Sequence, residues 1–445
     1  MLDFLLQLIQ TPAIILAIVA LIGLVLQKKN ASEVFSGTIK TALGMLMLSA
    51  GSSIIVQEIS PFVDLFQTVF NLDGFATSSE AVVGAMQTAI PVIARTSALI
   101  MAVGFIVNVV LARVTPLKYI FLTGHMMWIL SVTIAYGFYI NDYNESITIL
   151  AGSILQGMLM VILPAIAQPI VKKITKSDNI AYGHLTTVGV VASAYIGGAL
   201  GNKNKDAEEV ELPKSLSFFK DTSISVSIVM LIFYLFIIIS AGPKVVSEMA
   251  GEQNYIVYGI LKALGFTVGI LVLLQGVRLF LGELVPAFKG ISDKLVPGAR
   301  PALDVPALFG FAPNSLMIGF ISSVIGMLIA MLVSSIVFKA VPLVSIIGGF
   351  FTGGIAGIMG NATGGRRGAV ISGFVYGFIL IILSAFVYGI FDFGAVGSTG
   401  VGQDCIDAMI LMILFKQPII GIGIIIASFI LLSILEIKRK KKNNK

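Results

Sequence analysis

Four polar side chains stand in broken segments of an otherwise apolar chain, and their types suit the binding of a polar solute. His125 and His184, the only histidines, each directly follow a glycine, whereas Glu80 and Asp304 lie in polar or proline-rich stretches. Together they supply the convergent hydrogen-bond donors and acceptors that a polyhydroxylated ligand requires. We therefore predict that Glu80, His125, His184 and Asp304 bind substrate. For either histidine alone, packing within an apolar helix is the simpler explanation.

Other residues near these positions are candidates for a supporting role. Trp128 follows His125 by three residues, which places both on one helix face. Its ring suits stacking on a sugar, or anchoring at the membrane interface. Ser52, Thr123 and Asn361 add polar groups, the last within the glycine-rich run 348–365, whose composition favours close helix packing. We find no catalytic triad and no metal-ligand spacing, so we predict no catalytic residue, metal or cofactor.

A short phrase with glutamate between glycine and proline occurs twice. The first copy, GSSIIVQEISP, contains Glu58, and the second, GVRLFLGELVP, contains Glu283. Each carboxylate either contacts substrate or, as we prefer, has a structural role, such as accepting hydrogen bonds from backbone amides at a helix terminus. Arg278 lies close enough in the chain to pair with Glu283. We interpret these residues as markers of a repeated unit.

The elements that must position these side chains are membrane-spanning helices. The chain is 57% hydrophobic and only 12% charged, whereas a soluble domain carries about 25% charged residues. Spans need about 20 apolar residues each. We predict an all-α polytopic membrane protein with eleven spans, near 11–27, 41–57, 96–112, 118–138, 147–168, 224–241, 254–275, 317–338, 341–359, 369–391 and 418–436.

The distribution of lysine and arginine predicts the orientation. With the N-terminus outside, most basic residues, including those of the tail 438–445, fall in cytoplasmic segments, as the positive-inside rule requires. The N-terminal segment lacks the basic region and cleavage site of a signal peptide. One cysteine excludes a disulfide framework, and no nucleotide-binding loop is present. The net charge of +6 indicates topology and anionic lipid contact rather than nucleic-acid binding.

The spans divide into two halves of opposite orientation. Five spans lie in residues 1–222, five in 223–417, and a final span with the basic tail in 418–445. An odd number of spans per half inverts the second half, an arrangement typical of transporters. After each glutamate phrase comes a polar or broken stretch, 71–91 and 297–314, which we expect to form re-entrant hairpins that line the site. The segments 182–201 and 390–407 are similar and form a candidate further pair.

Several phrases of the chain resemble one family. Gly37-Thr38-Ile39-Lys40-Thr41, Leu122-Thr123-Gly124-His125, Gln275-Gly276-Val277-Arg278, Ala287-Phe288-Lys289-Gly290-Ile291-Ser292 and Phe311-Ala312-Pro313-Asn314 are similar to phrases of the ascorbate-type enzyme IIC permease of the bacterial phosphotransferase system. The resemblance runs in order along essentially the whole chain.

This resemblance implies a homodimer in the bacterial cytoplasmic membrane, with a V-motif domain and a core domain that carries the sugar. It implies import by an elevator-like movement, with phosphorylation by separate IIA and IIB proteins. It maps the substrate site onto His125, His184 and Asp304, with Glu80 at a hairpin position that relatives use. Ile129 and Leu185 stand where ascorbate permeases have glutamines, so another sugar, sugar acid or polyol is an alternative substrate.

Two other functions are alternatives to the permease. A proton- or sodium-coupled transporter of a small polar solute would use Glu80 or Asp304 as the coupling carboxylate. A membrane enzyme acting on lipids would need a nucleophile or metal cluster that the sequence does not indicate. The permease is the prediction that the chain supports best.

Overall fold

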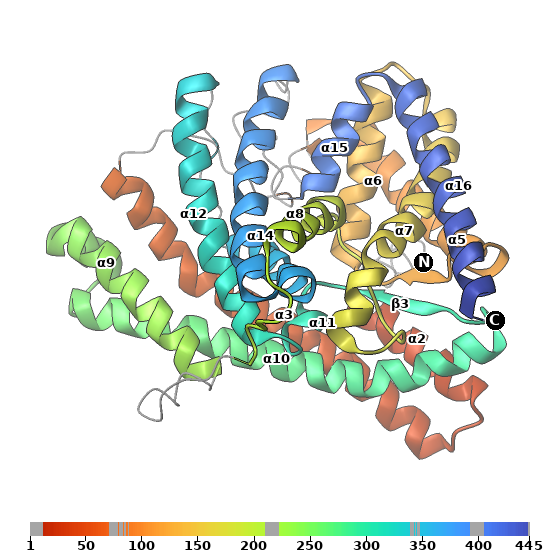
Figure 1. Ribbon diagram of the computed structural model, residues 1–445, viewed down its shortest axis with the longest axis horizontal. Coiled ribbons are helices and arrows are strands. Elements are labelled where there is room, and N and C mark those ends of the chain that lie inside the picture. Colours follow the sequence, from red (N-terminus) through yellow and green to blue (C-terminus); the bar gives the residue numbers. More distant parts are fainter. Residues whose placement is uncertain are drawn as a thin grey trace.

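The computed structural model describes residues 12–70, 79, 83, 86, 87, 89–209, 222–338, 342, 344, 348–391 and 405–443. Within them the chain is almost entirely helical (Figure 1). Prolines begin several helices, as expected for a residue that needs no amide partner there. The helices are α2 (Pro12–Leu26), α3 (Ala31–Phe70), α5 (Pro91–Val114), α6 (Gly124–Tyr139), α7 (Glu145–Thr175), α8 (Thr187–Leu200), α9 (Thr222–Ala250), α10 (Tyr255–Lys294), α11 (Pro306–Phe309), α12 (Pro313–Val337), the π-helix η2 (Gly349–Gly353), α14 (Gly354–Ile390), α15 (Ile406–Leu414) and α16 (Pro418–Asn443).

Seven helices of the described residues are long and apolar enough to cross a membrane: α5, α7, α9, α10, α12, η2 with α14, and α16. The prediction of a polytopic helical membrane protein is therefore confirmed, whereas the eleven predicted spans are not all present as such helices. Segment 11–27 forms the short α2, segment 41–57 belongs to α3, and segment 118–138 begins with a strand before α6. The spans predicted at 341–359 and 369–391 correspond, in their described parts, to two helical segments, because the backbone leaves helical geometry at Gly364 and Gly365 and folds back there. A Cβ atom on Gly360 would accordingly lie only 2.5 Å from the carbonyl oxygen of Gly368.

A small parallel sheet lies within the helical body, which a purely helical fold class did not anticipate. Its strands are β1 (Tyr119–Phe121), β2 (Ala181–Tyr182) and β3 (Arg300–Leu303), with β3 in the middle. Tyr119 is opposite Arg300, and Tyr182 is opposite Leu303. The broken stretch 297–314 therefore holds a strand and the short helix α11, where we expected a re-entrant hairpin of two half-helices. Most of the corresponding stretch 71–91 lies outside the described residues.

Two amide side chains complete the hydrogen bonds at the edges of this sheet. The buried Asn108 of α5 donates to the carbonyl of Tyr119 and accepts from the amide of Phe121. On the other side, Gln168 of α7 donates to the carbonyl of Ile180. Unpaired backbone groups are costly away from water, so these two amides allow a very short sheet to exist inside the protein.

Helices α3 and α10 pack closely against each other along the lower part of the molecule (Figure 1). A Cβ atom on Gly44 of α3 would lie only 2.5 Å from the backbone nitrogen of Phe280. Glu58 of α3 pairs with Lys262 of α10 at 3.0 Å, and Glu283 of α10 pairs with Lys40 of α3 at 3.1 Å. The sequence suggested Arg278 as the partner of Glu283, but the ion pair is formed with Lys40 from the other helix.

The Glu58–Lys262 pair offers a test of stability with an internal control. Its side chains are about one-fifth exposed, whereas Lys40 and Glu283 are 49% and 29% exposed. Lys262→Met is expected to destabilise the protein by about 2 kcal/mol, because it leaves a largely buried carboxylate unpaired. Lys40→Met is expected to cost less than about 1 kcal/mol, since exposed pairs contribute little.

Thermal unfolding in detergent measures both changes. The double variant Glu58→Gln with Lys262→Met removes the unpaired charge and is expected to recover much of the lost stability. Equal losses in the two single-lysine variants would contradict this assignment of unequal roles.

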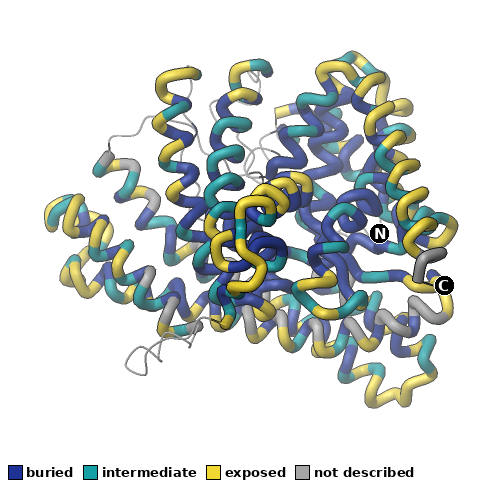
Figure 2. Tube along the Cα trace, viewed as in Figure 1, coloured by how far each residue is buried: buried dark blue, intermediate teal, exposed yellow. Residues whose placement is uncertain are grey.

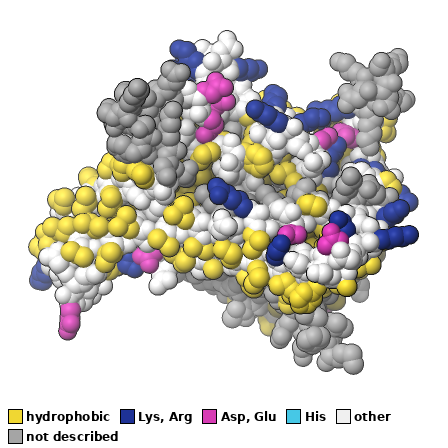
Figure 3. Space-filling view, turned by 90° about the horizontal axis from the view of Figure 1, so that it is seen from below, with side chains coloured by type: hydrophobic (Ala, Val, Ile, Leu, Met, Phe, Trp, Pro, Cys, Tyr) yellow, Lys and Arg dark blue, Asp and Glu magenta, His cyan; other side chains and the backbone are white. Residues whose placement is uncertain are grey.

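Buried residues concentrate in the middle of the molecule, and the outward faces of α9 and α16 are largely exposed (Figure 2). Seen from below, hydrophobic side chains gather over the end of the molecule formed by α9 and α10 (Figure 3). A row on α10 is exposed at alternating spacings of three and four residues, which places it on one helix face. Its members are Val257, Leu261, Leu264, Val268 and Leu271.

Candidate functional site

The carboxyl ends of the three parallel strands bring together three of the residues predicted to bind substrate. His125 follows β1, His184 follows β2, and Asp304 follows β3. Nε2 of His125 lies 3.7 Å from Oδ2 of Asp304, and Nε2 of His184 lies 3.7 Å from Oδ1 of the same carboxylate. Parallel strands end at a common edge, which explains how residues far apart in the chain converge.

His184 is held by its immediate neighbours. Its side chain is buried, and Nδ1 lies 3.0 Å from the hydroxyl of Thr186. That hydroxyl also contacts the hydroxyl of Tyr182, whose ring stacks beside the imidazole. Thr123 donates to the carbonyl of Gly183 at 2.6 Å, which ties the segment after β1 to the segment after β2. Thr123 therefore has a supporting position close to the site.

Asp304 is oriented by the backbone amide of the next residue, and His125 is the more exposed of its two imidazole neighbours. Oδ1 of Asp304 accepts from the amide of Val305 at 2.7 Å. The side chains of His125, His184 and Asp304 are 37%, 6% and 21% exposed. The carboxylate thus lies between a fixed imidazole and one that faces open space.

A cavity of about 460 Å³ opens beside His125. Trp128 lines it and donates from Nε1 to Oε1 of Gln87, whose own amide donates to the hydroxyl of Ser97. A second, much smaller cavity of about 20 Å³ includes Asp304 together with Met45 of α3 and Phe280 of α10. The site therefore lies where the sheet faces the α3–α10 pair.

Gln87 and Ser97 are polar residues of this cavity that the sequence analysis did not single out. Both belong to the part of the chain just before and within α5, which carried no distinctive motif. The prediction for Trp128 stays open between stacking on a ligand and another role, but its place on the cavity wall beside His125 is defined.

The remaining predicted residues have different positions. Glu80 lies outside the described residues, as does the side chain of Ser52. Asn361 accepts from the amide of Ala207 and donates to Asp206, so its amide holds the loop after α8. Glu58 and Glu283 lie in the α3–α10 pair described above, each joined to a lysine.

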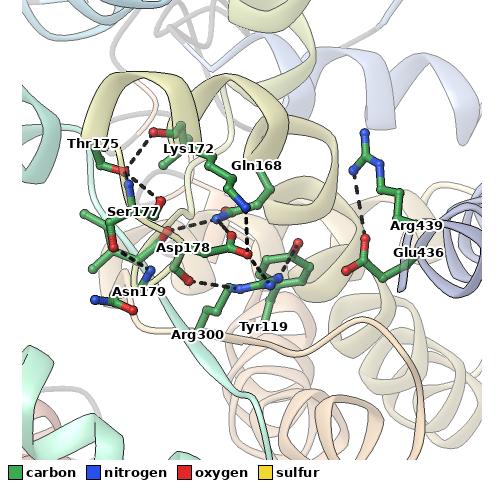
Figure 4. A network of polar contacts seen from close by, with 12 residues as sticks. Tyr119, Gln168, Lys172, Thr175, Ser177, Asp178, Asn179, Arg300, Glu436 and Arg439 are labelled. Carbon is green, nitrogen blue, oxygen red and sulfur yellow. Dashed lines mark hydrogen bonds and ion pairs between the residues drawn. The ribbon is translucent and has the colours of Figure 1, made fainter. Parts of the chain in front are cut away.

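At the opposite edge of the sheet, Arg300 at the start of β3 forms a polar network (Figure 4). Its guanidinium contacts Asp178 at 2.8 Å and the hydroxyl of Tyr119 at 3.1 Å. Burial alone would raise the pKa of Asp178, but the hydrogen bond from Gln168 and the charges of Arg300 and Lys172 lower it below the ordinary value. The network fixes the beginning of β3, four residues before Asp304.

Asp407 is a functional candidate that sequence reasoning missed. The segments 182–201 and 390–407 formed a candidate pair, and Asp407 of the second contacts the first in the structure. The buried carboxylate of Asp407 accepts from the amide of Val188 at 2.9 Å at the start of α8, and its own amide donates to Leu185. It therefore stabilises the helix that follows His184.

Asp407→Ala is expected to lower stability by about 1–2 kcal/mol, because it leaves amides at the start of α8 without an acceptor. Asp407→Asn keeps a side-chain oxygen in place and is expected to restore most of that loss. Thermal unfolding of the two variants in the same detergent checks this. Equally unstable alanine and asparagine variants would contradict the capping role.

Comparison with known proteins identifies the family of this chain. Residues 7–407 match the family described as the PTS system sugar-specific permease component. The chain is also similar to the ascorbate-specific PTS system EIIC component of Mycoplasma pneumoniae, with 29% identity over 438 residues. That match covers 85% of this chain and 65% of the relative, so the chain spans just under two thirds of the length of the relative. Because the family match extends over residues 7–407, which is most of the chain, the chain belongs to the family of sugar-specific permease components of the phosphotransferase system.

Proposed function

We propose that this protein imports L-ascorbate, or a closely related sugar acid or polyol, as the enzyme IIC permease of a phosphotransferase system. The observation that carries the proposal is the convergence of His125, His184 and Asp304 beside a cavity, in a chain of the permease family. The name of the Mycoplasma pneumoniae relative supports ascorbate as the first substrate to test.

The geometry suits a ligand with neighbouring hydroxyl groups. A carboxylate accepts from two hydroxyls through its two oxygens, and each imidazole of this site faces a different oxygen of Asp304. Buried polar groups in such a site reject analogues that lack the matching hydroxyls, because the protein groups are then left unpaired.

The two residues that replace expected glutamines do not form the polar wall of the cavity. Ile129 and Leu185 are both buried, at 0% and 1% exposure. An amide reaches the cavity from elsewhere, on Gln87. We infer that Gln87 supplies hydrogen bonds to the substrate that the positions 129 and 185 do not.

We further infer that transport moves the part bearing the sheet relative to α3 and α10. The small cavity at Asp304 is lined from both sides of this boundary.

The reciprocal ion pairs of Glu58 and Glu283 support two inverted repeats, since each repeat contributes one lysine and one glutamate. In this proposal the N-terminus is outside and the C-terminus inside the bacterial cytoplasmic membrane.

In this proposal, separate proteins phosphorylate the sugar. IIA and IIB would act on the sugar at the cytoplasmic side, drawing on phosphoenolpyruvate.

A homodimer is also proposed, with the exposed row on α10 around Leu264 as the surface to probe by cysteine cross-linking.

The decisive experiment offers labelled ascorbate to membrane vesicles that contain the permease. The soluble phosphotransferase proteins and phosphoenolpyruvate are present or omitted, and the chemical form of the accumulated label is determined. We expect phosphorylated ascorbate, formed only with the complete system. Accumulation of free ascorbate that ignores phosphoenolpyruvate and collapses with an ionophore would instead establish an ion-coupled transporter.

A further inference from the structure

We propose that His125, His184 and Asp304 form a binding site for a Zn²⁺-class transition-metal ion, and that the bound ion excludes the sugar. One nitrogen of each histidine and one oxygen of Asp304 all lie within 4.8 Å of one another. Metal binding is an inference from these atoms alone. Its effect on the sugar rests on the proposed function.

The donor set matches the ion. Two imidazole nitrogens and one carboxylate oxygen are ligands that Zn²⁺ accepts, and sites with three protein ligands leave a position open for water or another ligand. Imidazole favours transition metals, whereas Mg²⁺ and Ca²⁺ prefer sites built from oxygen alone. The site should therefore discriminate strongly against Mg²⁺ and Ca²⁺.

The three ligand atoms must move closer together to hold an ion. Ligand atoms about 2.0–2.1 Å from a tetrahedral Zn²⁺ lie about 3.3 Å from one another, whereas one ligand atom from each of the three residues lies within 4.8 Å of the others. The two Nε2 atoms lie 3.7 Å from different oxygens of Asp304. His125 can provide the closure, because its side chain is 37% exposed and borders the cavity.

The other two ligands are already oriented as metal ligands usually are. A metal-binding histidine generally has its second nitrogen in a hydrogen bond, and Nδ1 of His184 contacts the hydroxyl of Thr186 at 3.0 Å. When Nδ1 donates to that hydroxyl, Nε2 presents a lone pair toward Asp304. The amide of Val305 holds the carboxylate in place.

The proposal predicts competition because the metal and the sugar use the same atoms. An ion held by Nε2 of both histidines and by Asp304 occupies the donors that would bind hydroxyl groups. Free Zn²⁺ would thus inhibit binding of the sugar, and a chelator would reverse this inhibition.

The chain offers sharp variants for a test. It contains two histidines and one tryptophan, so His125→Gln with His184→Gln removes every imidazole, and Trp128 alone reports by fluorescence from the wall of the cavity. Asp304→Asn removes the carboxylate. Asp142→Asn is the matched control, because Asp142 lies in an exposed turn at φ 57°, which asparagine tolerates.

Purified full-length protein without an affinity tag is titrated with Co²⁺, followed by visible absorption and by quenching of Trp128. Zn²⁺ then displaces Co²⁺. We expect the unmodified protein to bind one ion per chain. Binding should be at least about tenfold weaker in Asp304→Asn and absent in the double-histidine variant. Asp142→Asn and added Mg²⁺ should leave binding unchanged. Binding that persists without both histidines, or binding absent below millimolar Zn²⁺, would overturn the metal site.

Ascorbate affinity is next measured at several buffered concentrations of free Zn²⁺. The apparent Kd for ascorbate is expected to rise in proportion to Zn²⁺, and unchanged ascorbate affinity on a Zn²⁺-saturated protein would overturn the exclusion. A protein that binds Zn²⁺ but never ascorbate would leave the metal site standing and refute the proposed substrate.

Discussion

Replacement of His184 by alanine is expected to lower the affinity for ascorbate by about 100-fold. The imidazole is 6% exposed and lies 3.7 Å from Oδ1 of Asp304, so its loss removes from a buried site a group that we propose to hydrogen-bond the sugar. Hydrogen bonds to charged groups contribute about 1.5–3 kcal/mol, and each 1.4 kcal/mol corresponds to about tenfold in affinity. Asp304→Asn is expected to have an effect at least as large, because it removes the charge that faces both imidazoles.

Isothermal titration of the purified variants with ascorbate measures these losses. Thermal unfolding without ligand shows whether each variant is folded, and Asp142→Asn repeats the aspartate change at an exposed turn. Folded His184→Ala and Asp304→Asn proteins that bind ascorbate with unaltered affinity would refute the assignment of the site. Thr186→Val is expected to lower the affinity for ascorbate by less than His184→Ala, since it retains the imidazole but removes the hydroxyl beside Nδ1.

The second large effect concerns the sheet that carries the site. Asn108→Leu keeps the approximate size of the side chain but leaves the carbonyl of Tyr119 and the amide of Phe121 without their partner. Each unsatisfied buried group costs about 1–3 kcal/mol, so a loss of about 2–6 kcal/mol is expected. His125 lies four residues after the end of β1, and ascorbate binding should fall together with stability.

Thermal unfolding and ascorbate titration of the same preparation check this expectation. Asn179→Leu provides the control, because it is the same substitution at an exposed position beside the sheet. A leucine at position 108 that leaves both the unfolding temperature and the ascorbate affinity unchanged would show that Asn108 does not support the sheet.

The meeting of His125, His184 and Asp304 could be predicted, but the sheet that brings them together could not. Polar side chains are rare in such an apolar chain, and the family resemblance maps the substrate site onto these three residues. The strands that join them are two to four residues long, too short for the alternation that identifies a strand. Residues 119–121 accordingly fell inside a predicted helical span.

The fold was predictable where one signal dominates. Long apolar runs correctly indicated α5, α7, α12 and α16, because length and hydropathy suffice for such helices. The predicted break between 359 and 369 matches the structure too, because Gly364 and Gly365 leave helical geometry there. Gln87 and Asp407 were missed, since their roles depend on contacts with Trp128 and Val188 that no local pattern records.

The crossed ion pairs between α3 and α10 have a consequence for biosynthesis. Glu58 and Lys40 leave the ribosome about 200 residues before Lys262 and Glu283. The early segment is therefore synthesised with a lysine and a glutamate whose partners have not yet been made. Synthesis of α10 then supplies both partners. We therefore expect α3 to reach its final packing only after the second half of the chain has been made.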